Sequence, residues 1–380
     1  MLLQERGNYK MNNNLKNTLI NNIVPILILI IIAFCFPLSG LSVTYTIQEM
    51  ILRLSRNLFL VLSLLIPIIA GMGLNFGIVL GAMAGQIALV FITDWQIVGM
   101  QGVLLAAIIS VPISILLGIM SGMILNRAKG REMITSMILG FFINGVYQLV
   151  VLYGMGKVIP ITNNKLVLSR GYGIRNAIDL KDVRKVLDSV FSLKIGDIEI
   201  PVFIFLIVAA LAWFTIWFRK TKLGQDMKAI GQDIEVSKTA GIDVERTRII
   251  AIVISTVLAG FGQIIYLQNI GTMNTYNSHE QIGMFSIAAL LVGGASASKA
   301  TILNAISGIF LFHMLFIVSP MAGKELMGSA QIGEYFRVFV SYGVIALTLV
   351  LHQWRREKER EELRRKLMEE RASQSQGGDE

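Results

Sequence analysis

The stretch "GVLLAAIISVPISILLGIMSGMIL" (residues 102–125) contains no charged side chain. A helix needs about 20 mostly apolar residues to cross the hydrocarbon core of a bilayer, and this stretch is long enough. Comparable runs are "IVPILILIIIAFCFPL" (23–38), "LFLVLSLLIPIIAGMGL" (58–74) and "PVFIFLIVAALAWFTIWF" (201–218). In the whole chain, 54% of the residues are hydrophobic and 16% are charged, whereas about 25% are charged in a typical soluble domain. The sequence therefore predicts a polytopic membrane protein.

Apolar runs of this kind predict about ten transmembrane helices. We expect them at residues 20–38, 57–73, 75–93, 102–125, 133–153, 201–218, 249–267, 281–293, 300–318 and 334–351. Lys and Arg collect in the short cytoplasmic segments of membrane proteins. With this number of spans, the basic clusters at 6–16, 127–131, 219–248 and after residue 355 all fall on one side. We therefore expect a multi-pass protein of the inner membrane with both termini in the cytoplasm.

The expected spans divide the chain into a cytoplasmic N-terminus (1–19), a transmembrane domain (20–351) and a charged cytoplasmic tail (352–380). Two polar segments interrupt the transmembrane domain, an extracytoplasmic insertion at 154–200 and a cytoplasmic segment at 219–248. Spans two to five and seven to ten form two sets that cross the membrane in opposite senses, as inverted repeats do. The predicted fold class is an all-α polytopic membrane protein with two inverted repeats and one extracytoplasmic insertion.

Glycines interrupt one apolar run in each of the two proposed repeats. In "GMGLNFGIVLGAMAG", glycine recurs at every fourth position from Gly73 onward, a spacing that favours close packing of helix backbones. We also expect Gly71 and Gly73 to break the helix near Asn75, and Gly293 and Gly294 to break the run "LLVGGASASKA". Paired interruptions in two repeats indicate a binding site between them.

The polar residues of the spans are amides and hydroxyls rather than charged groups: Asn75, Gln86, Asn144, Gln148, Ser255, Gln263 and Gln268. One role for such groups is to hold neighbouring helices together, at about 1 kcal/mol each, and this is the commoner role for any single residue. The other role is to form hydrogen bonds with an uncharged polar solute. We predict that the solute path is lined by Gly71, Gly73, Asn75, Gln86, Asn144, Gln263, Gly293 and Gly294.

The chain carries no recognisable energy source of its own. No Asp, Glu, Lys or Arg occurs in residues 58–93, 102–125, 133–153, 201–218 or 249–278, and proton-driven carriers keep titratable groups within the membrane. The run "GASASKAT" lacks the second glycine and the hydroxyl residue of a phosphate-binding loop. The three histidines have no Cys or carboxylate at the spacing of a metal site. A sodium-coupled secondary carrier, which can use backbone and hydroxyl ligands, remains an alternative.

A short charged stretch, "GQDMKAIGQDIEVSKTAGI" (224–242), stands between apolar runs. Asp233 is a good N-cap for a helix of about two turns, and Gly241 suits its C-terminal cap. We expect Ile230, Ile234 and Val236 to be exposed on this cytoplasmic segment. A solvated surface helix needs no such apolar residues, so they indicate a helix that docks onto another protein.

This stretch resembles the cytoplasmic coupling segment of the permease family of ATP-binding cassette (ABC) importers for simple sugars, nucleosides and branched-chain amino acids. The residues that match the family pattern are Gly224, Ala229, Gly231, Ala240, Gly241 and Ile242. Asp233 replaces the usual Asn, and Val236 and Ser237 replace small alanines. The resemblance covers about residues 58–350, and "LNFGIVLGAMAGQ" is closer to the nucleoside branch than to the sugar branch, although it lacks the nearby Glu of that branch.

The resemblance implies a transport protein rather than an enzyme, with a nucleoside or a simple sugar as its solute. It implies three kinds of partner in the membrane complex: an ATPase subunit or fused pair, a second permease that is a different chain or a second copy, and an extracytoplasmic solute-binding protein. This chain would bind no cofactor, because ATP and magnesium belong to the ATPase, and no nucleic acid. The residues expected to couple to the ATPase are Asp226, Ile230, Gly231, Asp233, Ile234, Ser237 and Gly241. The alternatives are an ion-gradient-driven secondary transporter of a small polar solute and a membrane scaffold that transports nothing.

Overall fold

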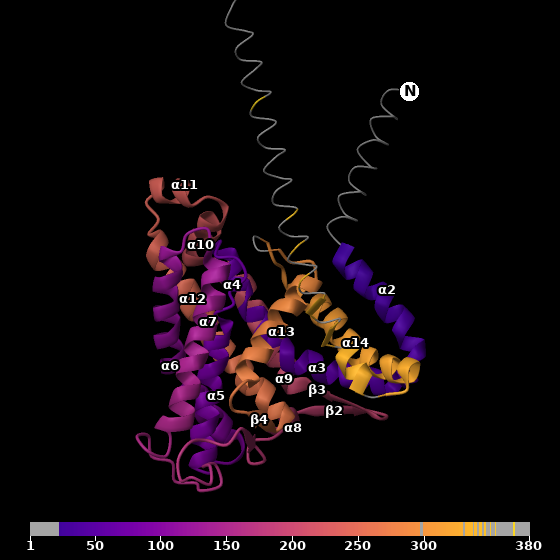
Figure 1. The fold of residues 1–380 in the computed structure, drawn as a ribbon. Helices are drawn as coiled ribbons and strands as arrows, with labels where there is room; N and C mark the ends of the chain where they lie inside the picture. The colour runs from indigo at the N-terminus through magenta and orange to yellow at the C-terminus, as the bar shows by residue number, and fades with distance from the viewer. Residues whose placement is uncertain are drawn as a thin grey trace, which may run out of the picture.

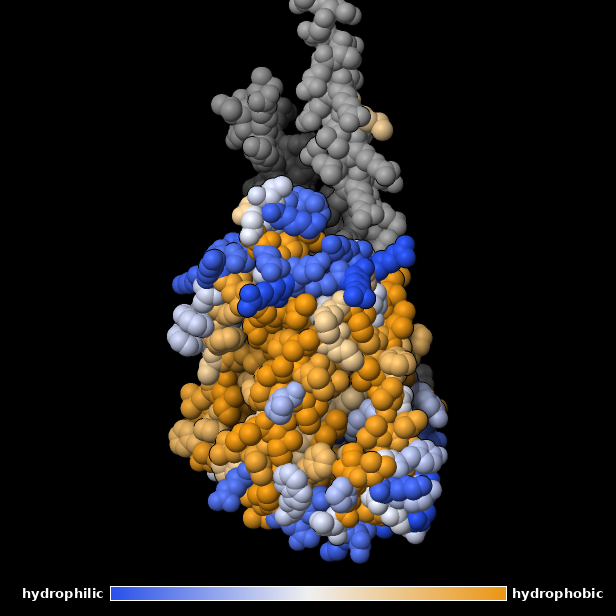
Figure 2. Space-filling model, turned by 90° about the vertical axis from the view of Figure 1, so that its left-hand side faces the viewer, coloured by the Kyte–Doolittle hydropathy of each residue, from blue (hydrophilic) through white to orange (hydrophobic). Residues whose placement is uncertain are grey.

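The computed structural model describes residues 23–296 and 299–329 without a gap, together with 331–336, 338–339, 342–343, 346, 350, 354 and 368. The chain forms a helical bundle (Figure 1). On the face drawn in Figure 2, hydrophobic residues form a band between two hydrophilic ends. The charged helices α10 (Lys222–Gln232) and α11 (Ile234–Thr239) lie at one end, and the loops that follow α7 (Glu132–Leu149) lie at the opposite end. This arrangement is that of a multi-pass membrane protein.

Five helical segments within the described residues are long and apolar enough to cross a membrane. They are α3 with α4 (Val43–Ser63 and Leu65–Ile69), α6 (Gly99–Arg127), α7 with the π-helical turn η1 (Val150–Gly154), α12 (Val244–Ile270) and α14 (Ile302–Met327). A sixth span results if α9 (Val202–Phe218) and α10 are counted together across a bend of 74°. The helices α2 (Ile23–Leu38), α5 (Ile78–Asp94) and α13 (Ser278–Val292) are shorter.

The predicted count of about ten spans is therefore not confirmed, and the inverted repeat remains a prediction. The expected span at 334–351 lies outside the continuously described residues. Several observed helices extend beyond the apolar runs from which they were predicted. The reason is that a helix can continue into the polar residues that flank such a run. The clearest case is α3, which begins at Val43 rather than near residue 57.

The insertion predicted at 154–200 contains strands as well as helix, so the fold is not exclusively α-helical. A hairpin joins β2 (Ser192–Ile195) to β3 (Ile198–Pro201), and α8 (Val186–Val190) precedes it. Strand β1 (Ala177–Asp179) pairs in antiparallel fashion with β4 (Thr272–Asn274), which lies between α12 and α13. The insertion is thereby fixed to the segment that leads into α13.

Helices α5, α6 and α12 pack together through glycines. A Cβ atom at Gly81 would collide with the carbonyl oxygen of Thr256, and one at Gly85 with that of Gly260. On α6, a Cβ at Gly118 would lie 2.9 Å from the Cα of Val253. Such contacts let helix backbones approach closely within lipid. The recurrence of glycine along α5 thus serves helix packing at Gly81 and Gly85.

Candidate functional site

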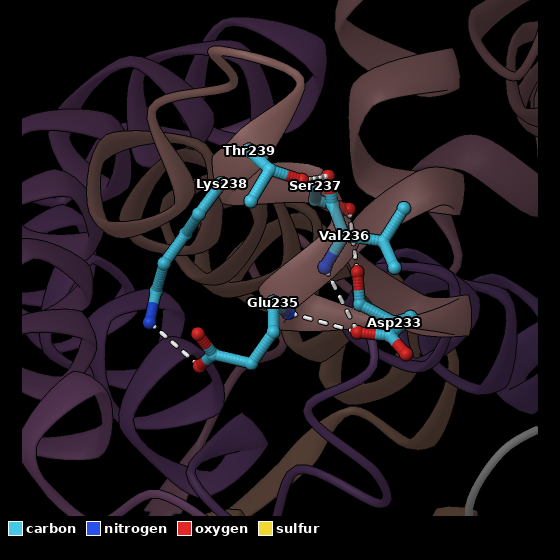
Figure 3. Close-up of polar contacts among 6 residues, drawn as sticks. All are labelled: Asp233, Glu235, Val236, Ser237, Lys238 and Thr239. Atoms are coloured by element: carbon cyan, nitrogen blue, oxygen red, sulfur yellow. Dashed lines mark hydrogen bonds and ion pairs between the residues drawn. The ribbon is translucent and has the colours of Figure 1, made fainter.

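The predicted capped helix is present as α11 and is shown in Figure 3. The Asp233 carboxylate accepts hydrogen bonds from the backbone N–H of Glu235 at 2.9 Å and of Val236 at 3.0 Å. The Ser237 hydroxyl donates to the carbonyl of Asp233 at 2.7 Å. The two bonds to the Asp233 carboxylate satisfy backbone N–H groups that a helix start leaves unpaired. The N-cap predicted at Asp233 is confirmed.

The other end of α11 closes on Gly241, which has a φ of +80°. Its N–H donates to the carbonyl of Lys238, and the N–H of Ile242 donates to that of Ser237. The predicted glycine cap is therefore confirmed, because only glycine adopts this left-handed conformation without strain. The helix itself spans six residues and is shorter than the two turns expected.

Of the three apolar residues predicted to be exposed on this segment, only Val236 is exposed. The side chain of Val236 is 63% exposed, and Ile234 and Asp226 are half-buried. Ile230, however, is only 1% exposed. It lies one turn after Met227, which is buried in a cluster with residues of α4 and α12. The prediction of an exposed Ile230 is wrong because α10 packs its apolar face against its own chain, so Val236 is the apolar residue that α11 presents outward.

Gly231, at the end of α10, contacts the segment that follows α4. A Cβ atom at Gly71 would lie 2.7 Å from the Cα of Gly231, and a Cβ at Gly231 would collide with the carbonyl oxygen of Ile69. The end of α10 and the end of α4 are thus in direct backbone contact. Sequence reasoning selected Gly71 and Gly231 separately, for different roles, and did not predict that they meet.

The contact is made where the chain breaks between α4 and α5. Gly71 and Gly73 both have a φ of +71°, so the break predicted near Asn75 is confirmed. The Asn75 side chain is 2% exposed, and its Oδ1 accepts from the N–H of Gly77 at 2.9 Å. The N–H of Phe76 donates to the Ser136 hydroxyl of α7 at 3.1 Å. The break is therefore an ordered structure that is held by α7.

A buried ion pair fixes α12 near its start. An Arg248 guanidinium nitrogen lies 2.5 Å from a carboxylate oxygen of Glu132, the first residue of α7, and the Arg248 side chain is fully buried. The Asn126 amide of α6 donates to the carbonyl of Glu245 at 2.8 Å. The start of α12 is thereby fixed to both α6 and α7.

The second predicted break lies between α13 and α14. Helix α13 ends at Val292, and Gly294 has a φ of +84°. The Asn304 amide donates to the carbonyl of Gly293 at 2.7 Å. A Cβ atom at Gly293 would collide with the carbonyl of Asn304. Gly293 therefore lies against α14, in a position where packing requires glycine.

Two of the predicted path residues, Gln86 and Asn144, meet in a buried polar network. His279 joins them: its Nε2 lies 2.9 Å from Asn144 Oδ1, and its Nδ1 lies 3.2 Å from Gln86 Oε1. The Gln86 amide also donates to the Tyr147 hydroxyl at 3.0 Å, and the Asn144 amide donates to Glu280 at 3.0 Å. The network connects α5 and α7 to the start of α13.

Sequence reasoning missed His279 because it tested the histidines only for metal-ligand spacing. The available signal was its position in "NSHEQ", where a polar stretch leads into an apolar run. Both His279 and Gln86 are fully buried. A buried polar group is nearly always hydrogen-bonded, so a buried His near buried amides predicts a network of this kind.

Gln263 has no such partners. It is fully buried on α12, and its Cβ lies 3.2 Å from the position of a Cβ on Gly85 of α5. Within the described part of the chain, neither its Nε2 nor its Oε1 has a hydrogen-bond partner. Asn75 also has an unpartnered amide nitrogen, but its Oδ1 is bonded, so Gln263 differs from it in that both amide atoms lack a partner among the described residues.

Comparison with known proteins supports the resemblance seen in the sequence. The nucleoside ABC transporter permease protein NupC of Lactococcus lactis subsp. cremoris is 28% identical over 153 residues, which are 40% of this chain and 46% of that protein. NupB of the same organism, also a nucleoside ABC transporter permease, is 37% identical over 92 residues, or 23% of this chain and 25% of that protein. The xylose transport system permease protein XylH of Haemophilus influenzae is 26% identical over 152 residues, which are 40% of this chain and 38% of that protein.

This chain thus spans less than half the length of these relatives. No solved structure matches it. A family model described as "Branched-chain amino acid transport system / permease component" matches residues 46–349, which is more than half of the 380 residues. The chain belongs to this family of transport permeases.

Proposed function

We propose that this chain is the transmembrane permease subunit of an ATP-driven importer, and that it forms the path for a nucleoside or a simple sugar. The observation that carries the proposal is the backbone contact between Gly231, at the end of α10, and Gly71, at the break before α5. It gives a force applied at the cytoplasmic end a direct route to the membrane domain. A protein driven by its own ion gradient has no need of such a route.

In this proposal, the ATPase subunit or fused pair docks on α11 and contacts the exposed Val236. Closure of the ATPase on ATP and magnesium displaces α11, and α10 transmits the displacement through Gly231 to Gly71. The ion pair between Glu132 and Arg248 makes α7 and α12 move with it. The break then changes its tilt and opens the path.

The remaining features are proposed on the same basis. The protein lies in the inner membrane with both termini in the cytoplasm and has about ten spans in two inverted repeats. A second permease, which is a different chain or a second copy, completes the path. A solute-binding protein docks on the extracytoplasmic insertion at 154–200. The absence of charged residues from 58–93 and 249–278 suits an uncharged solute, and NupC and NupB, both named as nucleoside permeases, favour a nucleoside.

The proposal is tested by replacing Gly231 with Val in the assembled importer. Because a Cβ at Gly231 would collide with the Ile69 carbonyl, we expect uptake of radiolabelled adenosine and xylose to be lost, while the chain still inserts and the complex still hydrolyses ATP. The matched control is Gly145→Ala on α7, where an added Cβ would have nothing within 4 Å. Normal uptake by Gly231→Val contradicts the proposal. Uptake by the native complex that needs an ion gradient but no ATP would support the secondary transporter instead.

A further inference from the structure

We propose that Gln263 recognises the hydrogen-bonding edge of a nucleobase in the transported solute. This inference rests on the proposed function and narrows its solute class to nucleosides. It begins from the burial of Gln263, whose exposed fraction is 0%, and from the lack of a partner for both of its amide atoms among the described residues. A buried amide without hydrogen bonds destabilises the protein. Such a group in a native structure therefore calls for an explanation, and a bound solute that pairs with both amide atoms supplies one.

The surroundings of Gln263 allow its two neighbouring helices to separate. On α5 it faces Gly85, and one turn earlier on α12 lies Gly260, whose Cβ position is 2.9 Å from the Ser114 hydroxyl of α6. The Ser114 hydroxyl also lacks a partner within the described residues. Glycine surfaces have no interlocked side chains that must be withdrawn when helices part. Two unpaired polar groups therefore flank an interface that can open.

The three helices around Gln263, α5, α6 and α12, favour an uncharged ligand. Residues 102–125 of α6, 249–270 of α12 and 78–93 of α5 contain no Asp, Glu, Lys or Arg. An ionic solute would be poorly stabilised there, since a buried charge needs a partner. Nucleotides and amino acids are thereby disfavoured relative to nucleosides and sugars.

The geometry of a glutamine amide favours the nucleobase over the sugar hydroxyls. Its N–H donor and C=O acceptor lie side by side in one plane, which is how Asn and Gln form two simultaneous hydrogen bonds with adenine. Nucleobases present donors and acceptors at fixed positions in one plane, whereas each hydroxyl of a sugar ring can rotate and serve as donor or acceptor, so it specifies the pairing less strictly. Such a two-bond pair discriminates between bases by about 1–3 kcal/mol.

Another buried glutamine of α12 shows what a purely structural role looks like. The amide of Gln268 donates to Asp188 at 2.9 Å, and its Oε1 accepts from the N–H of Leu187 at 3.3 Å. Gln268 thus fixes α8 to α12 with both of its polar groups. It is the same residue type, in the same helix and equally buried, and it provides a matched control.

The test compares Gln263→Met with Gln268→Met in the assembled importer, reconstituted in proteoliposomes. Uptake of radiolabelled adenosine is measured in competition with unlabelled adenosine and with purine riboside, which lacks the exocyclic amine. We expect the native importer to prefer adenosine by about tenfold, and Gln263→Met to abolish that preference and raise KM for adenosine by about tenfold or more. The thermal midpoint of the purified chain is expected to stay the same or rise in Gln263→Met and to fall in Gln268→Met.

The outcomes separate this inference from the function on which it rests. A Gln263→Met importer that keeps its KM and its preference, or whose thermal midpoint falls as that of Gln268→Met does, shows that Gln263 only packs helices and overturns the inference. A variant that loses xylose uptake while adenosine uptake is unchanged overturns the choice of nucleobase. If the native importer carries neither adenosine nor uridine in the presence of ATP, the proposed nucleoside substrate itself fails.

Discussion

At the level of residues 85 and 86, the two faces of α5 have opposite relations to a buried glutamine. On one face, Gln86 is bonded through both amide atoms to His279, Tyr147 and a backbone carbonyl. On the other face, Gly85 lies beside Gln263, whose amide has no partner among the described residues. A saturated network resists separation because parting it leaves polar groups unpaired. The face at Gly85 loses no such hydrogen bonds if α5 and α12 move apart. We therefore call the Gln86 face of α5 the fixed side, and the Gly85 face the side that can part.

The largest expected loss of stability is that of His279→Leu, which disrupts the hydrogen-bond network on the fixed side of α5. This change leaves Gln86 Oε1 and Asn144 Oδ1 without their contacts at 3.2 Å and 2.9 Å. A neutral imidazole carries one N–H, so it donates to one of these two oxygens. The acceptor that loses this bond costs about 1–3 kcal/mol and the lost edge contact with the Tyr147 ring about 1 kcal/mol, so the free energy of unfolding should fall by about 2–4 kcal/mol. The measurement is unfolding of the purified chain in mixed SDS micelles. A loss below about 0.5 kcal/mol, the ordinary range for an uninvolved position, would mean that the network does not hold α13.

A smaller loss of stability is expected when a methyl group is added at Gly85, where α5 packs against α12. In Gly85→Ala, the added Cβ meets the carbonyl of Gly260, and overpacking of this kind costs about 1–3 kcal/mol. The matched change Gly145→Ala places a Cβ with nothing within 4 Å and should be neutral or stabilise by up to about 1 kcal/mol. The same unfolding assay compares the two variants. Equal stabilities would show that α5 and α12 are not in backbone contact at Gly85.

Local chemistry made one part of this site predictable from sequence. The caps at Asp233 and Gly241 depend on residues within a few positions, and the glycine break near Asn75 depends on residues adjacent to it. Their confirmation reflects short-range backbone preferences that hold in many folds.

Contacts between distant residues were not predictable in the same way. His279 and Gln86 are 193 positions apart, and nothing local indicates that Gly71 and Gly231 touch. The prediction that Ile230 is exposed failed for the same reason, because its burial depends on how α10 packs against α4 and α12. Sequence pattern identified which residues are unusual, whereas tertiary packing decided which of them meet.

Tyr147→Phe should weaken the fixed side without breaking it. The Tyr147 hydroxyl donates to the carbonyl of Thr275 at 2.9 Å and accepts from Gln86 at 3.0 Å. Gln86 keeps its other bonds in the variant, so the expected loss is that of an ordinary hydrogen bond, about 1 kcal/mol. A loss as large as that of His279→Leu would show that the phenol, rather than the imidazole, holds the network together.

The smallest expected effect comes from two serines that differ in whether the hydroxyl has a partner. The Ser255 hydroxyl of α12 donates to the carbonyl of Ser63 in α3 at 2.9 Å, so Ser255→Ala should cost about 1 kcal/mol. The Ser114 hydroxyl beside Gly260 is buried and has no partner within the described residues. Removing it should leave stability unchanged or raise it by a few tenths of a kcal/mol, because an apolar atom replaces a group that burial destabilises. If Ser114→Ala is as costly as Ser255→Ala, the Ser114 hydroxyl is satisfied in the folded protein, and the contrast between the two faces of α5 is smaller than the structure indicates.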